Sequence, residues 1–401
     1  MSAVEGGGLA RTVRALHVSG SLSRSDIGAI TGLNRSSVAA VVAGLVAAGV
    51  AEEAAGTSGT VGRPSRVVRA VPDSLAVIGW DLRADSSSAV VEGFGGLILH
   101  RWSKEHRRGS TDPFEVAARV VTGSSQIAEE LPDHVRLVGI GCAIPGVINP
   151  GGDPPRSVIH RAPTLGWVDT PFGVILSEAL RERFGAQVPV VLGNDADLGA
   201  MAEWTRGAGR DSAVMLFVSG DVGIGGGLIV DGVPMTGASG FAGEIGHMLF
   251  EKDGAPCRCG ARGCWETVIG VDTIVRAAGQ DPTTTSVGDV LSAAQVGDEP
   301  CQRALAEASR ALGQGLASLV NIVNPDTVVL TGHLEVLLRE YRHTIVEELR
   351  HTLSRDSTVV RIVAPSLGSD SILVGAAESA FERTLEHPQR WLTVTEELRI
   401  E

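Results

Sequence analysis

The stretch SRSDIGAITGLNRSSVAAVVAGLVAAGV at residues 23–50 decides how the beginning of the chain folds. Ser23 opens a capping-box pattern, which favours a helix that starts directly after it. Gly32 lies in a tight turn, and Asn34 can cap a further helix over residues 35–48, whose apolar side chains recur on one face. Two short helices joined by a glycine-containing turn predict a helix-turn-helix.

The sequence on both sides extends this motif into a small domain. Apolar spacing predicts a first helix over residues 9–18, and residues 50–53 and 65–71 predict a β-hairpin after the third helix. The loop of that hairpin would form a wing that carries Gly62-Arg63-Pro64. We therefore predict a winged helix-turn-helix domain over residues 1–72.

A helix-turn-helix places its second helix in the DNA major groove, so Arg35, Ser36 and Ser37 are candidate DNA contacts. Arg63 resembles the arginines of arms that enter a narrow minor groove. Residues 1–72 contain seven arginines and four carboxylates, which gives them a net charge of +3. Because the whole chain has a net charge of −13, the remaining residues carry −16. A basic head on an acidic body favours a nucleic-acid-binding module. The alternative is a three-helix protein-interaction domain that binds no DNA.

The rest of the chain alternates strand and helix patterns, which predicts an α/β fold. The composition, with 43% hydrophobic and 20% charged residues, is that of a globular protein and excludes a wholly disordered chain. No apolar run reaches the ~18–20 residues of a membrane span, and the N-terminus lacks a signal-peptide pattern. We therefore expect a cytoplasmic protein. The clearest segments are strands at 75–82, 135–144 and 188–192 and helices at 114–131, 302–323 and 372–383.

The segment HMLFEKDGAPCRCGARGCWE at residues 247–266 contains the strongest local signal. His247, Cys257, Cys259 and Cys264 have the spacing H-x9-C-x-C-x4-C, and three thiolates with one imidazole complete a tetrahedral zinc site. Because no coordination position stays open, we predict one structural zinc per chain and no metal-activated water. The alternatives are free buried cysteines and an iron–sulfur site.

Polar residues surround this segment in the sequence. Glu244 precedes His247 by three residues, Glu266 follows Cys264, and Asn194-Asp195 follows a predicted buried strand. Together, these side chains offer donors and acceptors for a polyhydroxylated ligand such as a sugar. Taken singly, each has a simpler explanation, because a lone glutamate often starts a helix and Asn-Asp often forms a turn.

Several motifs together resemble the ROK family, which contains sugar kinases and sugar-responsive repressors. The resemblance implies an actin/hexokinase-like (ribonuclease H-like) fold with two α/β lobes, at residues 73–195 plus 372–390 and at residues 196–371. The winged-helix segment resembles that of the repressor members. The predicted sugar-binding residues are Asn194, Asp195, Glu244, His247, Glu266 and Gly146. The motifs are PG at 145–146, NDADLGAMAEW at 194–204, VSGDVGIGGGLIVDG at 218–232, GEIGH at 243–247 and CRCGARGCWE at 257–266.

Departures from the family pattern separate its two activities. The kinases have a Gly-Gly-Thr phosphate turn after the first strand, where this chain reads Asp81-Leu82-Arg83-Ala84-Asp85. Asp221, His333 and Thr164 also replace family residues. Without backbone amides that can approach a phosphate, phosphoryl transfer loses its main source of catalysis.

The resemblance therefore implies a sugar-responsive transcriptional repressor that is not an enzyme. Its partners would be operator DNA and a sugar or sugar-phosphate effector, and it would form a homodimer or homotetramer without membrane contact. Two alternatives remain open. One is an ATP-dependent sugar kinase with Asp195 as the catalytic base, and the other is a regulator whose ligand pocket is vestigial.

Overall fold

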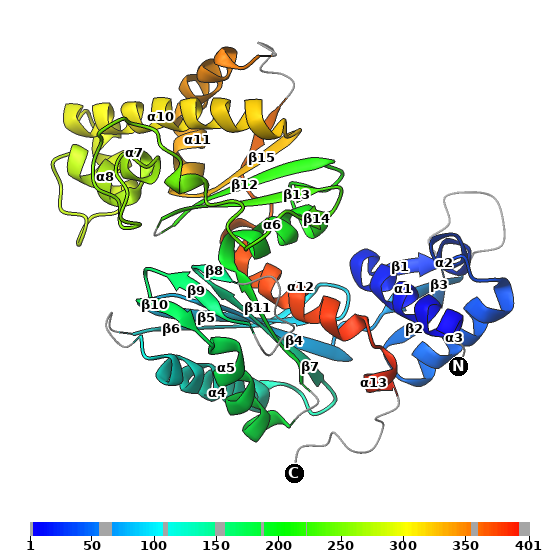
Figure 1. The fold of residues 1–401 in the computed structure, drawn as a ribbon. Coiled ribbons are helices and arrows are strands. Elements are labelled where there is room, and N and C mark those ends of the chain that lie inside the picture. The colour runs from blue at the N-terminus through cyan, green and yellow to red at the C-terminus, as the bar shows by residue number, and fades with distance from the viewer. Residues whose placement is uncertain are drawn as a thin grey trace. The chain divides into compact units, whose positions relative to one another are not determined.

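A computed structural model describes residues 3–55, 66–106, 111–148, 157–185, 188–221, 223–353 and 360–392. The chain divides into two compact units, each built around its own five-stranded sheet (Figure 1). The predicted division into residues 1–72 and two lobes stays a prediction. Unit 1 comprises Met1–Ile144, Gly152–Gly193 and Ala376–Glu401, and unit 2 comprises Pro145–Gly151 and Asn194–Gly375.

Unit 1 begins with the predicted winged helix. Helices α2 and α3 meet at 112°, and the three short strands pair antiparallel in the order β1-β3-β2. The helices are α1 (Ala3–Ser19), α2 (Arg24–Thr31) and α3 (Arg35–Ala47), and the strands are β1 (Ser21–Ser23), β2 (Ala51–Ala55) and β3 (Arg66–Ala70).

Local signals set the helix ends of this domain. The Ser23 hydroxyl accepts a hydrogen bond from the Asp26 amide at 3.1 Å, and the Asp26 carboxylate accepts one from the Ser23 amide, which completes the predicted capping box. Gly32 ends α2 with φ 71°, a conformation that favours glycine. The Asn34 side chain caps α3 by accepting from the Ser37 amide at 2.9 Å. Ile27 on α2 is fully buried, which anchors that helix in the domain core.

A five-stranded sheet in the order β11-β7-β4-β5-β6 forms the rest of unit 1. Every residue of its central strand β4 is buried, and β4 pairs parallel with β7 and antiparallel with β5. Helices α4 and α5 lie side by side against this part of the chain (Figure 1). The strands are β4 (Leu75–Leu82), β5 (Ser86–Gly93), β6 (Ile98–Glu105), β7 (Arg136–Ile144) and β11 (Val190–Asn194), and the helices are α4 (Pro113–Glu130), α5 (Phe172–Phe184) and α13 (Gln389–Leu392). In unit 1, β9 (Ile159–Ala162) and β10 (Trp167–Thr170) pair antiparallel, whereas the short strand β8 (Val147–Ile148) belongs to unit 2.

Unit 2 contains the sheet β14-β13-β12-β15-β16. The predicted Asp231-Gly232 hairpin joins β13 to β14, with φ 48° and 79° at the two turn residues. The strands are β12 (Val214–Gly220), β13 (Ile224–Val230), β14 (Val233–Pro234), β15 (Thr327–Gly332) and β16 (Arg361–Val363). The helices are α6 (Asp195–Arg206), α7 (Glu266–Ile269), α8 (Val271–Ala277), α9 (Val287–Gln295), α10 (Glu299–Val323) and α11 (His333–Glu348), with 3-10 turns η1 (Ile245–His247), η2 (Leu349–His351) and η3 (Gly368–Asp370).

The helix α12 (Ser371–Leu385) begins in unit 2 and ends in unit 1. Within the described residues, no single helix is long and apolar enough to cross a membrane. The strongly bent pair α2 and α3 meets that length and composition test only when its two helices are taken together. Both are the helices of the helix-turn-helix.

Candidate ligand cluster, metal centre and DNA-binding surface

The six predicted sugar-binding residues form the candidate ligand cluster: Gly146, Asn194, Asp195, Glu244, His247 and Glu266. Asn194 ends β11, and Asp195 begins α6. Asn194 caps α6, because its side-chain oxygen accepts from the amides of Ala196 at 2.9 Å and Asp197 at 3.1 Å. Its side-chain nitrogen donates to the Gly146 carbonyl at 2.9 Å. Two of the predicted sugar-binding residues are therefore in direct contact, although they are 48 positions apart.

Glu244 and Glu266 approach the cluster from two other segments. Glu244 precedes η1, and its carboxylate lies 3.7 Å from His247 Nε2. Glu266 is the first residue of α7 and accepts a hydrogen bond from the Ile224 amide at 3.1 Å. A side chain at Gly223 would collide with the Glu266 carboxylate, so the glycine-rich turn before β13 makes room for this acid.

Sequence reasoning missed one acidic residue, Asp197. Burial, and secondarily the negative charge of Glu244, raises the pKa of Asp197 to about 7. Burial also raises the pKa of Glu244, an effect that His247 opposes and Glu266 reinforces. In the sequence, Asp197 is an ordinary acid, and only its half-buried position, where the charge of Glu244 acts on it, distinguishes it. The cluster therefore has a carboxyl group that changes charge near neutral pH.

The predicted metal ligands lie together in unit 2. One ligand atom from each of His247, Cys257, Cys259 and Cys264 lies within 4.8 Å of all the others. The His247 Nδ1 atom is 3.6 Å from the Cys257 sulfur, and the sulfurs of Cys259 and Cys264 are 3.7 Å apart. Burial raises the pKa of the Cys257 and Cys264 thiols, so a bound cation would have to displace their protons. The group could hold a metal ion.

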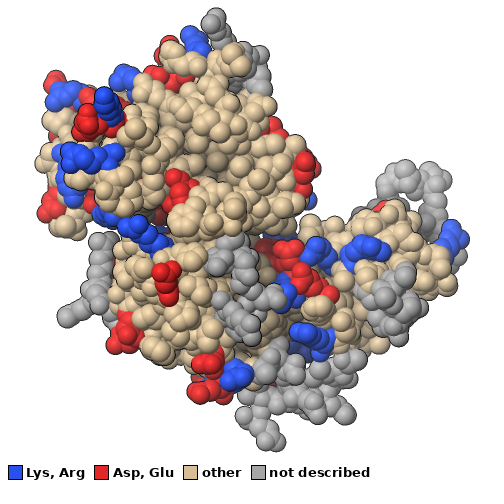
Figure 2. Space-filling model, in the orientation of Figure 1, with Lys and Arg blue, Asp and Glu red and all other residues tan. Residues whose placement is uncertain are grey.

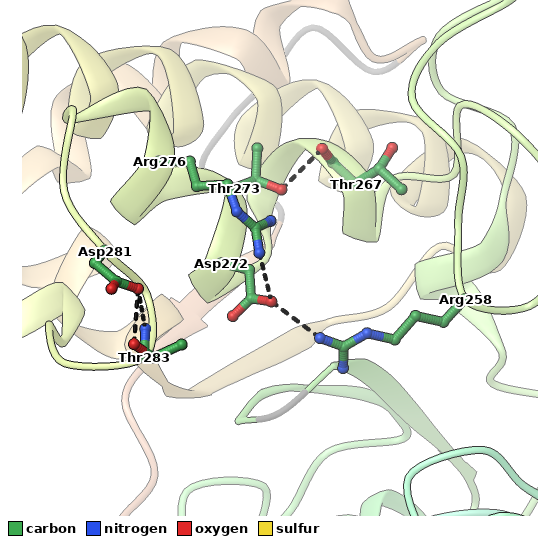
Figure 3. A network of polar contacts seen from close by, with 7 residues as sticks. All are labelled: Arg258, Thr267, Asp272, Thr273, Arg276, Asp281 and Thr283. Atoms are coloured by element: carbon green, nitrogen blue, oxygen red, sulfur yellow. Dashed lines mark hydrogen bonds and ion pairs between the residues drawn. The ribbon is translucent and has the colours of Figure 1, made fainter.

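An ion-pair network holds the loop between these cysteines against the helices that follow (Figure 3). Arg258, which lies between Cys257 and Cys259, pairs with Asp272 on α8 at 3.0 Å. Asp272 also pairs with Arg276 at 3.4 Å. Thr273 donates from its hydroxyl to the Thr267 carbonyl on α7 at 3.1 Å. The cysteine loop is thereby joined to the same short helices that begin at Glu266.

The predicted DNA contacts lie at the start of α3. Arg35 and Ser36 are exposed and Ser37 is half-buried, with the Ser36 hydroxyl donating to the Asn34 side chain at 2.7 Å. Ser36 and Ser37 also line a largely apolar hollow of about 660 Å³ between α1, α3 and Leu392. On the face shown in Figure 2, basic and acidic side chains are both present over the described residues. Arg63 lies outside the described residues.

Two residues that depart from the kinase pattern have structural partners of their own. After β4, the Arg83 guanidinium pairs with Asp81 at 2.8 Å, and the Arg83 amide donates to the Ser86 carbonyl at 3.0 Å. In unit 2, the His333 side chain is buried between the carbonyls of Gly220 and Ile269, the latter 2.7 Å from Nε2. Burial lowers the pKa of His333 despite these two acceptors. Both side chains serve local packing in this structure.

Comparison with known proteins gives two kinds of relative. A xylose repressor from Bacillus spizizenii is 27% identical over 364 residues, covering 88% of this chain and 91% of that protein. A glucokinase from Halalkalibacterium halodurans is 30% identical over 259 residues, covering 60% of this chain and 74% of the enzyme. One relative is thus named a repressor and the other a kinase.

A solved structure described as a ROK family transcriptional regulator, homologue of the E. coli MLC protein, has the same fold. Its TM-score is 0.78 at 22% identity, covering 98% of this chain and all of the other. That likeness confirms the predicted fold class, a winged helix-turn-helix followed by an actin/hexokinase-like domain. The sequence pattern of the ROK family matches residues 100–382, well over half of the chain. The protein therefore belongs to the ROK family.

Proposed function

We propose that this protein is a transcriptional repressor of carbohydrate metabolism whose ROK domain binds a sugar or a sugar-derived effector. The observation that carries the proposal is the combination, in one chain, of a winged helix-turn-helix with a cluster of polar side chains around Asn194. The similarity to xylose repressors over most of both chains supports it. An enzyme needs no helix-turn-helix, whereas a sugar-controlled repressor needs both parts.

In this proposal, the winged helix over residues 1–72 binds operator DNA. Arg35, Ser36 and Ser37 at the start of α3 enter the major groove, and Arg63 contacts the minor groove. A homodimer or homotetramer presents two such heads to two half-sites about one helical turn apart. Arg35 is exposed and has a side chain that can bond to two acceptors of one base, so it is the first residue to test.

The effector would bind where the polar side chains of unit 2 gather. Asp195 and Glu244 accept hydrogen bonds from sugar hydroxyls, and Glu266 and His247 orient the ring, while Asn194 holds the Gly146 carbonyl in place. A carboxylate that accepts two hydroxyl hydrogens gives the directional recognition that sugars need. The sugar names carried by the relatives make d-xylose and d-glucose the first candidates.

We also propose that one zinc ion per chain is held by His247, Cys257, Cys259 and Cys264. Three sulfurs and one imidazole nitrogen suit zinc, and their mutual distances within 4.8 Å fit a shared ion. Zinc would supply a structural cross-link. By fixing His247, it would also fix the orientation of Glu244, which lies 3.7 Å away.

A ROK-type kinase is the second candidate, favoured by Asp195 and by the 30% identity to a glucokinase. Two observations count against it. Arg83 is paired with Asp81, so it is not available to compensate for the missing glycine turn. The imidazole of His333 is buried against the end of β12, at the turn where the kinases have a second glycine. We therefore propose that the protein is not an enzyme.

One experiment separates the two functions. Full-length protein selects its operator from a random duplex library, and its affinity for that duplex is then measured with and without d-xylose and d-glucose. An ADP-release assay with the same sugars runs in parallel. We expect a sugar-dependent change in operator affinity without ADP, and loss of that change in Asp195→Asn. Sugar-dependent turnover at ~1–100 per second would establish the kinase instead.

A further inference from the structure

The helix α12 is shared by the two compact units. Its first five residues, Ser371–Gly375, belong to unit 2, and the remainder, from Ala376 to Leu385, belongs to unit 1. At one end it contacts α6, the helix that begins at Asp195. Its part in unit 1 contacts α1, the first helix of the winged helix, through Glu378 and Glu382. The contact with α6 runs through the buried carboxylate of Glu203, and the contact with α1 runs through the buried imidazole of His17.

In unit 2, a buried carboxylate fastens the end of α6 to the start of α12. Glu203 on α6 is fully buried and accepts four hydrogen bonds. The donors are the amides of Ala208 at 2.7 Å, Ser366 at 3.0 Å and Leu367 at 3.0 Å, and the Ser371 hydroxyl at 2.7 Å. Hydrogen bonds to a buried charge are strong, and removing any one leaves an unpaired group. These bonds fasten α6, the helix that begins at Asp195, to the start of α12.

Close backbone contacts hold the middle of α12 on both sides of the unit boundary. In unit 2, a side chain at Gly375 would overlap the Leu198 carbonyl on α6. In unit 1, a side chain at Gly141 on β7 would overlap the Ala376 carbonyl. Backbones this close cannot slide past each other without losing contact. The first half of α12 is therefore packed tightly on α6, and its second half is packed tightly on β7.

In unit 1, His17 joins α12 to the winged helix. Its side chain is only 2% exposed. The Gly95 amide donates to Nδ1 at 3.0 Å, so the proton of the neutral ring lies on Nε2, which donates to Glu378 on α12 at 3.2 Å. The ring packs against Phe94 and Phe381, with centroids 5.6 and 4.3 Å away. His17 thus contacts α12 by a buried hydrogen bond and by an aromatic face.

The geometry argues against a metal ion at this contact. His17, Glu92 and Glu378 have ligand atoms within 4.8 Å of one another, which resembles a metal site. A metal on Nε2 would move the ring proton to Nδ1, where it would face the Gly95 amide hydrogen. The Gly95 contact therefore favours an Nε2 proton directed at the carboxylate.

An exposed ion pair between the same two helices, α1 and α12, provides a comparison. Arg14 pairs with Glu382 at 2.8 Å, but these side chains are 51% and 52% exposed. Exposed pairs of this kind contribute little, because water and salt screen them. The two contacts join the same pair of helices, one through a buried hydrogen bond and the other through an exposed ion pair.

We propose that α12 transmits the occupancy of the ligand cluster to the DNA-binding head, with His17 as the positioning residue that makes the head follow the helix. The inference rests on the proposed function and assigns its regulation to one contact. A ligand that binds two arrangements of α6 unequally shifts α12, and the buried bond between His17 and Glu378 carries that shift to α1.

The test uses full-length protein and the operator duplex, with saturating d-xylose and, separately, d-glucose. The variants are His17→Leu, which removes the donor but keeps an apolar side chain, and His17→Gln, which places an amide N–H near the Nε2 position. Glu382→Gln is the matched control. Operator affinity is measured with and without sugar, and sugar affinity is measured on protein without DNA.

We expect His17→Leu to reduce the sugar-dependent change in operator affinity at least tenfold, with sugar affinity and sugar-free operator affinity within threefold of wild type. His17→Gln should recover part of the change, and Glu382→Gln should match wild type. An unaltered sugar response in His17→Leu would overturn the proposal, while leaving the repressor function intact. A wild-type protein that ignores every sugar tested would instead contradict the proposed function itself.

Hydrogen exchange on the wild-type protein covers the case in which His17→Leu does not fold. Sugar should alter amide protection in α6, in α12 and in α1, and leave α4 unchanged. If sugar alters exchange in α6 but leaves α12 or α1 unchanged, the proposal is overturned.

Discussion

In the winged helix, the residues that set the helix ends are three positions apart, as Ser23 and Asp26 or Asn34 and Ser37 are. In the ligand cluster, the hydrogen-bonded partners are 48 positions apart for Asn194 and Gly146, and 42 for Glu266 and Ile224. Short-range contacts form as soon as their own segment folds, whereas long-range contacts require the whole unit. Damage to the cluster should therefore spread through unit 2, and damage to the head should stay local.

The largest expected effect comes from the cysteine group. Cys259→Ser should abolish stoichiometric zinc binding and lower the free energy of unfolding of unit 2 by about 4 kcal/mol, because a structural metal is lost. Metal analysis measures the zinc content, and thermal unfolding followed by two independent probes measures the loss of stability. Cys301→Ser, at a buried cysteine outside the cluster, is the control. A wild-type protein that contains no zinc, or a Cys259→Ser variant as stable as the wild type, would refute the assignment of a structural zinc.

A pH-dependent effect is expected at Asp197. Its carboxyl keeps its proton to a pH of about 7 in the folded chain, against a reference of 3.8, so rising pH destabilises the folded state between these values. Asp197→Asn removes that penalty and should raise the melting temperature at pH 8 on the order of 5 °C. The gain should shrink towards pH 5.

Thermal melts from pH 5 to pH 8 measure this difference. Asp133→Asn, at an exposed position, should show no such trend. A gain that is the same at every pH would mean that Asp197 does not carry the predicted proton.

A smaller effect is expected at the DNA surface. Arg35→Ala should weaken operator binding by about 1–3 kcal/mol and relax sequence preference, since a base-reading side chain is lost. Its sugar affinity should not change. Fluorescence anisotropy with operator and scrambled duplexes measures both the operator affinity and the sequence preference. Arg339→Ala on α11 is the control. Equal weakening on both duplexes would assign Arg35 to the phosphate backbone.

The smallest effect is expected at a helix cap. Ser23→Ala removes the hydroxyl that accepts from the Asp26 amide, and such caps contribute about 1 kcal/mol. The loss should appear as faster hydrogen exchange in α2 and slightly weaker operator binding. Ser292→Ala, on an exposed face of α9, is the control. A stability loss that extends into unit 2 would contradict the local character of the head.

Much of the site was predictable where it depends on spacing. The cysteine group follows from its spacing alone, and the winged helix follows from the caps and turns between Ser23 and Gly49. The ligand cluster was anticipated through resemblance, since Asn194, Glu244 and Glu266 are individually ordinary. The roles of these residues stay predictions. The helix α6 was not predicted, and with it the depth at which Asp197 lies was missed.

The sequence by itself determined many of the helices and strands and the metal-ligand set, because helix caps, glycine turns and ligand spacing act over a few residues. Only the tertiary structure decided which polar residues become buried together. His17 is one histidine near the end of a helix in the sequence, yet in the fold it bonds to Glu378, 361 positions later. Glu203 likewise reads as a surface acid until the segment 366–371 closes over it. Burial is a property of the packed chain, and it turns these ordinary side chains into strong, specific contacts.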